Sequence, residues 1–202
     1  MKTSSFWFNI IFILVLVFHF TSLHASGDKR KIYDNKRHKI GIQRGFSFQN
    51  GLAVDYIYRV HYFQLQYHYA FFVTKNWSFE LVFQPQYNEV QLKNDREDAA
   101  FSKAWEVGLN GGLMVRKNIL KDRLGFFACV SSGPHYLSQS VPRQAHGFIF
   151  SDNFFAGINI KLIKIMHLDT RFGLRHVSNA GIKNPNGGIN NLFGSLGLFF
   201  VL

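Results

Sequence analysis

Apolar and polar residues alternate along most of the chain with a period of two, which is the period of a β-strand with two unlike faces. Between Trp77 and Tyr87 the odd positions are mainly apolar and the even positions are mainly polar. Between Phe148 and Leu162 the apolar positions are the even ones. We predict eight strands from such segments: 40–48, 55–73, 77–90, 101–116, 124–138, 148–163, 167–178 and 191–202.

The connections between these segments alternate in length. Those at 91–100, 139–147 and 179–190 are long and polar, whereas those after the second and sixth segments are very short. In an antiparallel barrel this alternation puts the long connections at one end, as in outer-membrane barrels. The sequence therefore predicts an all-β protein, an eight-stranded antiparallel transmembrane β-barrel of the outer-membrane type.

A soluble barrel of the lipocalin type, apolar inside, is the alternative. The pattern of loop lengths disfavours it, and so do the charged and polar residues on the face opposite to the apolar one. In a membrane barrel these residues would fill the interior: Glu80, Glu106, Asn159, Arg171 and Arg175.

The first residues have the features of a secretory signal peptide. Lys2 precedes an apolar run at 6–20, and Ala25 or Ser26 offers a cleavage position. The run is shorter than the roughly 20 apolar residues that a spanning helix needs, although a retained N-terminal anchor is the alternative. We predict a signal peptide, a basic N-terminal segment and a barrel domain: 1–26, 27–39 and 40–202.

The composition agrees with export to a membrane. Aromatic residues make up 17% of the chain and charged residues only 17%, which is more apolar and aromatic than a water-soluble domain needs. The formal charge of +11 is concentrated in 28–39, and the export signal argues against a nucleic-acid partner. An anionic membrane surface is the expected partner of this segment, and a solvated tail is the alternative. Cys129 is the only cysteine, so no internal disulfide or cysteine-rich zinc site is expected.

The seventh segment carries the candidate chemistry. His176 and Ser178 share the even face with Phe172 and Leu174, so they are predicted to point toward lipid near the outer end of the strand. Polar residues there are unfavourable unless they lie at the interface or have a task. A serine nucleophile needs a base that takes its proton, and a histidine two residues away on the same face can approach it. Ordinary polar residues at a strand end are the alternative.

The string that begins with this pair, HVSNAGIKNPNGGIN at 176–190, resembles the motif of the lipid A 3-O-deacylase (PagL) family, H-x-S-N-A-G followed by P-N-x-G-[I]-E. The resemblance covers the last three predicted strands well and the first half mainly by architecture. It implies an outer-membrane esterase that removes a 3-hydroxyacyl chain from lipid A of lipopolysaccharide in the outer leaflet, without a metal or an organic cofactor.

The resemblance also implies a role for each residue of the string. Ser178 would be the nucleophile and His176 the general base. The side chain of Asn179 and the backbone amide of Gly181 would be the oxyanion donors, and the side chain of Asn186 would hold the loop. Small residues in such a turn let backbone amides approach a developing oxyanion, although a plain glycine-containing turn has the same composition.

One position departs from the family motif. Asn190 stands where the family has the acidic residue that orients the histidine, and an amide carries no charge. Asp152 is the candidate substitute: a tight hairpin at 163–166 pairs residues whose numbers sum to about 328–330, which places Asp152 opposite His176 or Ser178. A solvated residue at the base of a loop is its alternative role. The rival functions are a structural or adhesive barrel without activity, and a family member with reduced activity.

Overall fold

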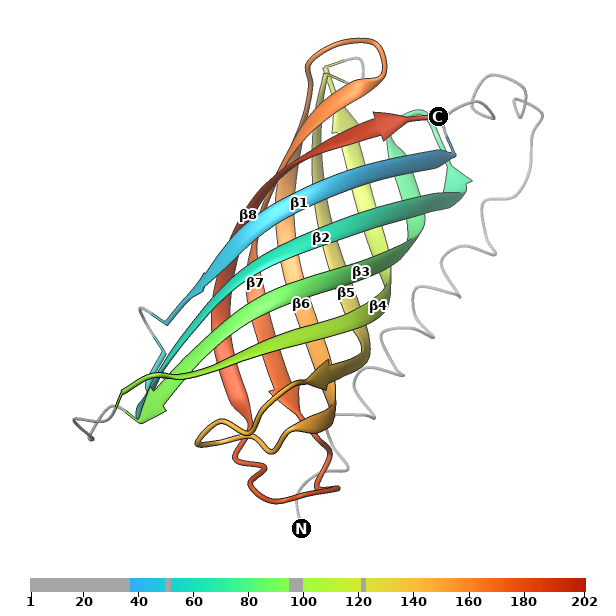
Figure 1. The fold of residues 1–202 in the computed structure, drawn as a ribbon. Coiled ribbons are helices and arrows are strands. Elements are labelled where there is room, and N and C mark those ends of the chain that lie inside the picture. The colour runs from blue at the N-terminus through green and yellow to red at the C-terminus, as the bar shows by residue number, and fades with distance from the viewer. Residues whose placement is uncertain (1–36, 50–51, 95–99, 121–122) are drawn as a thin grey trace. The chain divides into compact units, whose positions relative to one another are not determined.

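The computed structural model of the protein describes residues 37–49, 52–94, 100–120 and 123–202. They form a closed barrel in which each strand pairs antiparallel with its neighbours in sequence and β8 pairs with β1 (Figure 1). The strands are β1 His38–Phe48, β2 Tyr56–Val73, β3 Trp77–Asn94, β4 Ser102–Ile119, β5 Leu124–Leu137, β6 Gly147–Lys161, β7 Met166–Ser178 and β8 Ile189–Val201. The predicted eight-stranded antiparallel barrel is confirmed.

The predicted signal peptide, 1–26, and residues 27–36 of the predicted basic segment lie outside the described residues. Within the described ranges, no helix is long and apolar enough to cross a membrane.

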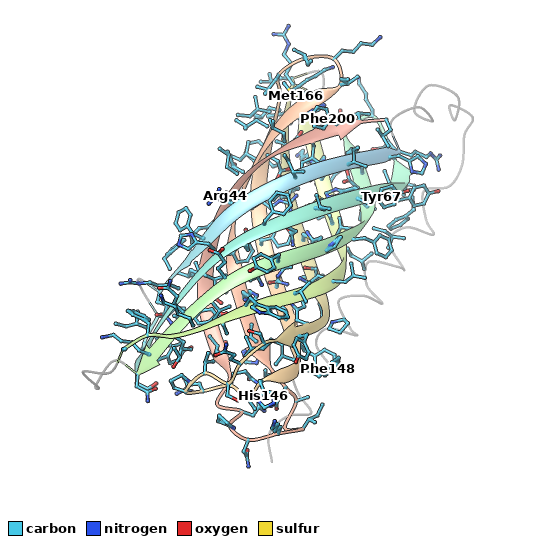
Figure 2. The ribbon with its side chains drawn as sticks, viewed as in Figure 1. Arg44, Tyr67, His146, Phe148, Met166 and Phe200 are labelled. Atoms are coloured by element: carbon cyan, nitrogen blue, oxygen red, sulfur yellow. The ribbon has the colours of Figure 1, made fainter. Side chains whose placement is uncertain are left out.

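The alternation of apolar and polar residues along each strand gives the barrel wall two different faces. One phase of each strand presents apolar side chains to the outside, where Phe154 and Phe172 are each 55% exposed (Figure 2 shows side chains projecting from the wall). The other phase points inward, and all five polar residues that were predicted to fill the interior are buried: Glu80, Glu106, Asn159, Arg171 and Arg175. An apolar outside around a polar inside is the arrangement of a barrel that spans a membrane.

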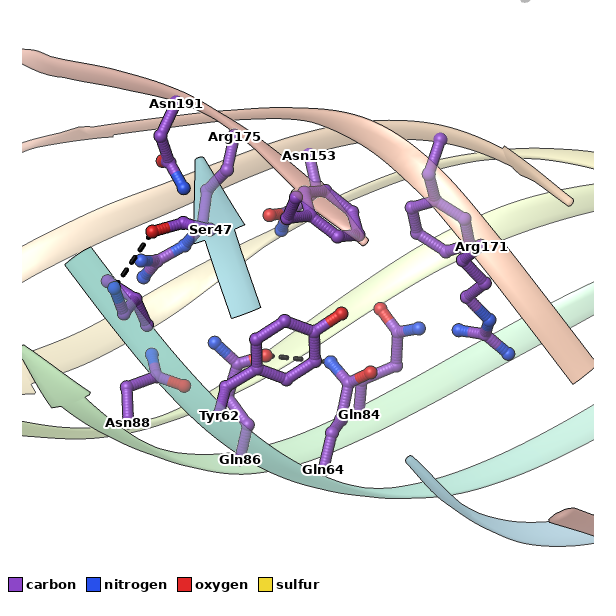
Figure 3. Close-up of a pocket in the computed structure, with 13 residues that line it drawn as sticks. Ser47, Tyr62, Gln64, Gln84, Gln86, Asn88, Asn153, Arg171, Arg175 and Asn191 are labelled. Carbon is purple, nitrogen blue, oxygen red and sulfur yellow. Dashed lines mark hydrogen bonds between the residues drawn. The ribbon is translucent and has the colours of Figure 1, made fainter. Parts of the chain in front are cut away.

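Buried charges inside the barrel are paired. Glu80 accepts hydrogen bonds from Lys39 Nζ at 2.6 Å and Arg116 Nε at 3.0 Å, and Asp169 accepts one from Arg171 Nε at 2.6 Å. Pairing offsets the cost of removing charge from water. Side chains fill the interior and leave a cavity of about 20 Å³, enough for one water molecule (Figure 3). The interior is thus a packed core.

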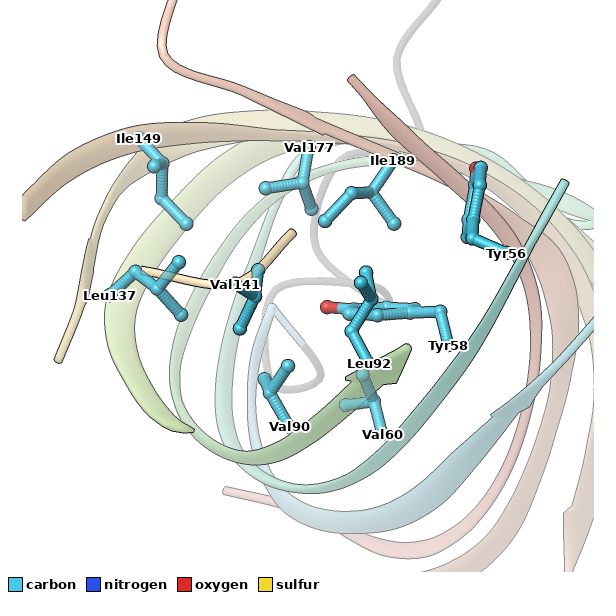
Figure 4. Close-up of a cluster of buried hydrophobic side chains, with 10 residues drawn as sticks. All are labelled: Tyr56, Tyr58, Val60, Val90, Leu92, Leu137, Val141, Ile149, Val177 and Ile189. Atoms are coloured by element: carbon cyan, nitrogen blue, oxygen red, sulfur yellow. The ribbon is translucent and has the colours of Figure 1, made fainter. Parts of the chain in front are cut away.

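The last residues of β1, β3, β5 and β7, which lead into the longer connections, lie at one end of the barrel, and the last residues of β2, β4 and β6 lie at the other (Figure 1). A cluster of buried apolar side chains closes the interior at the end with the longer connections (Figure 4). Its members come from six strands and one connection: Tyr56, Tyr58, Val60, Val90, Leu92, Leu137, Val141, Ile149, Val177 and Ile189.

Several predicted strand ends differ from the observed ones by one to four residues, and two of these differences involve residues of the apolar cluster. The predicted connection 91–100 begins as strand, because Leu92 continues the inward phase, is fully buried and pairs with Ser102 of β4. The predicted connection 179–190 also ends early, since β8 begins at Ile189, whose side chain joins the apolar cluster. Asn190 therefore lies on a strand, and this places it beside the candidate histidine.

Candidate active site

His176 and Ser178 lie at the end of β7 that leads into the connection with β8. Their neighbours Arg175 and Val177 are buried inside the barrel, so alternation turns both candidate residues to the outer wall, where they are half-buried. Among the residues that the structure describes, no hydrogen bond engages the Ser178 side chain. Its main chain is fixed by pairing with Phe150 of β6. The serine hydroxyl is thus held at a defined place on the outer wall.

His176 contacts Asn190 across the β7–β8 ladder, with Nδ1 2.7 Å from Asn190 Oδ1. Both main-chain groups of Asn190 bind the hydroxyl of Tyr56 and so point away from β7. The pair is therefore of the non-hydrogen-bonded kind, in which Cα atoms lie about 4.5 Å apart and side chains come closest. Because the amide oxygen accepts, Nδ1 carries the proton and Nε2 remains as the basic nitrogen.

Asp152 of β6 is the partner of His176 on its other side, in agreement with the predicted register. Main-chain groups alternate sides along a strand, so those of His176 face β6 and this pair is of the wider kind, with Cα atoms about 5.5 Å apart. The Asp152 carboxylate turns toward β5 instead, where Oδ1 accepts a hydrogen bond from Ser132 Oγ at 2.5 Å. Of the two candidates, the structure brings Asn190 to the histidine and leaves Asp152 bound to Ser132.

The connection after Ser178 is organised by the buried side chain of Asn179. Its Nδ2 donates to Lys183 O at 2.6 Å, and its Oδ1 accepts from Gly181 N at 3.0 Å. Asn186 Oδ1 in turn accepts from Asn179 N at 2.9 Å, which ties the loop's second half to its start. Ala180 and Gly181 both have positive φ, 55° and 82°, and they make the sharp turn beside the serine.

This arrangement bears on the expected oxyanion donors. In this structure the amide of Gly181 and one hydrogen of Asn179 Nδ2 are already bound within the loop. The second Nδ2 hydrogen of Asn179 has no acceptor among the described residues. Asn179 is also 1% exposed, so a substrate oxyanion would meet its Nδ2 only after the side chain turns outward, and it would have to displace Asn179 Oδ1 from the amide of Gly181.

A second connection braces the loop from the β5–β6 side. Ala145 N donates to Pro185 O at 2.8 Å and Gly187 N donates to Arg143 O at 2.8 Å. Main-chain contacts of this kind fix the loop's position whatever side chains it carries. The backbone next to Ser178 is therefore held by two connections and not by one alone.

Three residues that contact the site were missed by the sequence reasoning. Gly188, with φ +65°, packs against the histidine ring, and a Cβ built on it would lie 3.1 Å from His176 Cε1. Tyr56 and Arg143 bind the segment 187–190 from distant parts of the chain. The paired glycines at 187 and 188 were a signal of close approach, whereas nothing near Tyr56 or Arg143 in the sequence points to the motif.

Comparisons with known proteins agree with the barrel fold and with the family resemblance of the motif. The family model "Lipid A 3-O-deacylase (PagL)" matches residues 61–199, whereas no curated protein sequence matches the chain significantly. The crystal structure of the outer membrane enzyme PagL superposes with a TM-score of 0.56 at 17% identity, covering 81% of this chain and 99% of that one.

Two further barrels are similar in structure. Ail, the attachment invasion locus protein of Yersinia pestis, has a TM-score of 0.45 at 12% identity and covers 82% of this chain and 97% of its own. Neisserial surface protein A has a TM-score of 0.48 at 10% identity and covers 82% and 96%. At these identities a likeness establishes the fold alone, whereas the family model spans more than half of the sequence. The chain belongs to the lipid A 3-O-deacylase (PagL) family.

Proposed function

We propose that this protein is an outer-membrane ester hydrolase that removes an ester-linked acyl chain from lipid A, with Ser178 as nucleophile and His176 as base. One observation carries the proposal. The Nδ1 of His176 is held by Asn190 at 2.7 Å while Ser178 shares the outward face two residues away. Family membership supplies the substrate class, which is the lipid A of lipopolysaccharide.

The first chemical step is acyl transfer to the enzyme. Nε2 of His176 takes the proton of the Ser178 hydroxyl as its oxygen attacks the ester carbonyl, and the C–O bond to the sugar then breaks. The imidazolium returns the proton to the leaving sugar oxygen. Water, deprotonated by the same nitrogen, then attacks the acyl-serine and releases the fatty acid. Both half-reactions need Nδ1 to stay protonated and fixed, which is the task of Asn190.

The turn after Ser178 provides the oxyanion donors of the proposal. The side chain of Asn179 donates to the carbonyl oxygen by turning out of its buried position as that oxygen becomes negative, and Gly181 N joins it by leaving Asn179 Oδ1. Asn186 keeps the start of the turn in place through its bond to Asn179 N. A donor that already points at the oxyanion contributes about 3–4 kcal/mol to the transition state, and breaking the bonds within the loop reduces this contribution here.

The location of the pair agrees with a substrate in the membrane. His176 and Ser178 are on the apolar outer wall, next to the exposed Phe172 and Leu174, and close to the end that bears the longer connections. We infer that this end faces the cell exterior, so the pair meets lipid A in the outer leaflet. Export by a cleaved signal peptide, 1–26, completes the proposal.

A fluorophosphonate probe tests the nucleophile. It phosphorylates an activated serine with loss of fluoride, so the purified barrel in detergent should be labelled on the peptide that contains Ser178. His176→Asn should remove the labelling, because the serine is then no longer activated, while Ser132→Ala, a second outward-facing serine near the site, should leave it unchanged. Labelling of wild type and His176→Asn to the same extent would refute the assignment.

A barrel without activity, structural or adhesive, is the second candidate. Asn190 favours it, because an amide cannot balance the charge of the imidazolium that forms during catalysis. A barrel of this kind would take up no probe at Ser178 and would leave lipid A intact. A family member of reduced activity would be labelled slowly and would turn over slowly.

A further inference from the structure

The main chain of Asn190 lacks the β1 partner that residues of β8 have from Leu192 onward. The pairing of β1 with β8 ends at Phe48 and Leu192, so β1 stops two residues before Asn190 is reached. An unpaired main-chain amide and carbonyl at a strand edge leave the backbone free to shift. At this position the shift would move the one side chain that contacts His176.

The hydroxyl of Tyr56 takes the place of the missing strand. It accepts a hydrogen bond from Asn190 N at 2.7 Å and donates one to Asn190 O at 3.1 Å. Tyr56 is the first residue of β2, it is 4% exposed, and Figure 4 shows it beside Ile189 in the apolar cluster. One buried hydroxyl on β2 therefore makes hydrogen bonds to both main-chain groups of Asn190 on β8, across the position where β1 is missing.

Side chains also take the place of main-chain hydrogen bonds between the end of β1 and β2. Ser47 Oγ accepts from Val60 N at 2.8 Å, and Gln49 Oε1 accepts from Tyr58 N at 2.8 Å. Where β1 ends, side chains therefore replace main-chain hydrogen bonds both to β2 and to β8. Of these three contacts, only that of Tyr56 reaches a residue that touches the candidate catalytic pair.

Arg143 holds Tyr56 and the next part of the segment together. Its guanidinium carbon lies 4.7 Å from the centre of the Tyr56 ring, and its Nη2 and Nε donate to the carbonyls of Gly187 at 2.7 Å and Gly188 at 3.1 Å. Nη1 pairs with Asp55 at 3.1 Å. Since Gly188 packs on the His176 ring and Asn190 binds its Nδ1, the Tyr56–Arg143 pair fixes both surfaces against which the ring rests.

We propose that Tyr56 and Arg143 are positioning residues for the histidine base: they hold Asn190 and Gly188 so that His176 keeps Nδ1 protonated and Nε2 directed to Ser178. This inference rests on the proposed hydrolase function. It explains how an uncharged residue at position 190 can hold the histidine. Because its backbone is fixed on both sides, the amide oxygen of Asn190 stays within hydrogen-bond distance of His176 Nδ1. A carboxylate attracts the imidazole by its charge, whereas the neutral amide of Asn190 depends on the surrounding residues to hold it next to His176 Nδ1.

Tyr56→Phe tests this, because it keeps the ring in the cluster and under Arg143 while it deletes the hydroxyl. We expect kcat on lipid A to fall roughly tenfold, because both hydrogen bonds that hold the main chain of Asn190 are lost, with KM unchanged within about twofold. Tyr58→Phe is the matched control: it deletes a buried hydroxyl two residues away that binds Arg175 and does not touch Asn190. It should retain wild-type kcat.

A second readout does not depend on activity. Nitrogen-15 spectra of histidine-labelled barrel, with the His176 signals identified by their loss in His176→Asn, report which ring nitrogen carries the proton. The wild type and Tyr58→Phe should show the Nδ1–H tautomer, and Tyr56→Phe a mixture of tautomers. Arg143→Lys, which keeps the charge but loses the two-carbonyl contact, should shift kcat and tautomer in the same direction and serves if Tyr56→Phe does not fold.

The outcomes separate the two proposals. If the wild type hydrolyses lipid A and both variants match it in kcat and tautomer, the positioning role is refuted and the hydrolase function stands. If the wild type hydrolyses no lipid A, the hydrolase function fails, and the tautomer comparison alone decides whether Tyr56 and Arg143 hold the ring.

Discussion

Gly188 and His176 are in close contact: a Cβ on the glycine would lie 3.1 Å from His176 Cε1, so the ring would have to move by a few tenths of an ångström, and the φ of Gly188 is +65°. We predict that Gly188→Ala lowers kcat by about tenfold by displacing the ring. It should also reduce the free energy of unfolding by about 1–2 kcal/mol, because the left-handed backbone is strained by any Cβ.

Gly147→Ala is the control for that strain. Gly147 also has a positive φ, +101°, but a Cβ on it would meet nothing within 4 Å. Unfolding in urea should show a comparable loss of stability for both variants, and only Gly188→Ala should lose activity per folded molecule. Equal activity of the two variants would contradict the contact with the histidine.

Restoring the acid of the family motif should increase the rate. A carboxylate at position 190 stabilises the imidazolium, and removing such an acid costs other triads orders of magnitude. We predict that Asn190→Glu raises kcat by roughly tenfold or more. The initial rates of wild type and variant on one lipid A preparation are the measurement.

Asp152→Asn is the companion variant. Its carboxylate binds Ser132 and faces away from the histidine, so its loss should change kcat by less than about twofold. A large loss with Asp152→Asn, together with no gain from Asn190→Glu, would mean that Asp152 orients His176 across the wider β6–β7 pair and that the contact with Asn190 is incidental.

Much of the fold was predictable because the strands of a membrane barrel alternate between apolar outward residues and polar inward residues, so the period of two is clear in the sequence. Glu80 lies between Phe79 and Leu81, and it points to the inside, as its phase assigns. Strand ends were less predictable. The inward and outward phases of β3 continue to Asn94, but the pattern reverses near its end, where Glu89, Gln91 and Lys93 point outward and the apolar Val90 and Leu92 point inward.

The candidate site was predictable only as far as it is local in sequence. His176 and Ser178 share a face by simple counting, and the β6–β7 hairpin gave the register of Asp152. Which side chain reaches His176 depends on the alternation of narrow and wide pairs in the β7–β8 ladder, which the sequence does not show. Tyr56 reaches Asn190 from 134 residues away because β1 ends at Phe48, and no local pattern announces this contact.

The outward phase of the strands predicts how stability depends on depth in the membrane. Phe154 lies at the middle of β6 and Phe148 near its outer end, both on the apolar face. Phe154→Arg should cost about 2–4 kcal/mol of unfolding free energy in lipid vesicles, and Phe148→Arg about 0–1 kcal/mol. Equal costs would indicate that this face does not cross a hydrocarbon layer.

The interior charges make a separate prediction. Glu80 is fully buried and binds Lys39, His68 and Arg116, so Glu80→Gln leaves buried cations without their counter-charge. We expect a loss of about 3–5 kcal/mol in unfolding free energy. Glu89→Gln, at an exposed position of the same strand, should be nearly neutral. A loss equally small for Glu80→Gln would show that the buried cluster is not stabilised by its carboxylate.

Mass spectrometry of lipid A tests the central claim most directly. Lipid A should be extracted from matched cells that produce wild-type protein, Ser178→Ala or neither, after the two proteins are shown to be present in equal, folded amounts in the outer membrane. The account predicts species that lack one 3-hydroxyacyl chain only with the wild type. Identical lipid A from all three cultures, or the same shortened species with Ser178→Ala, would contradict it.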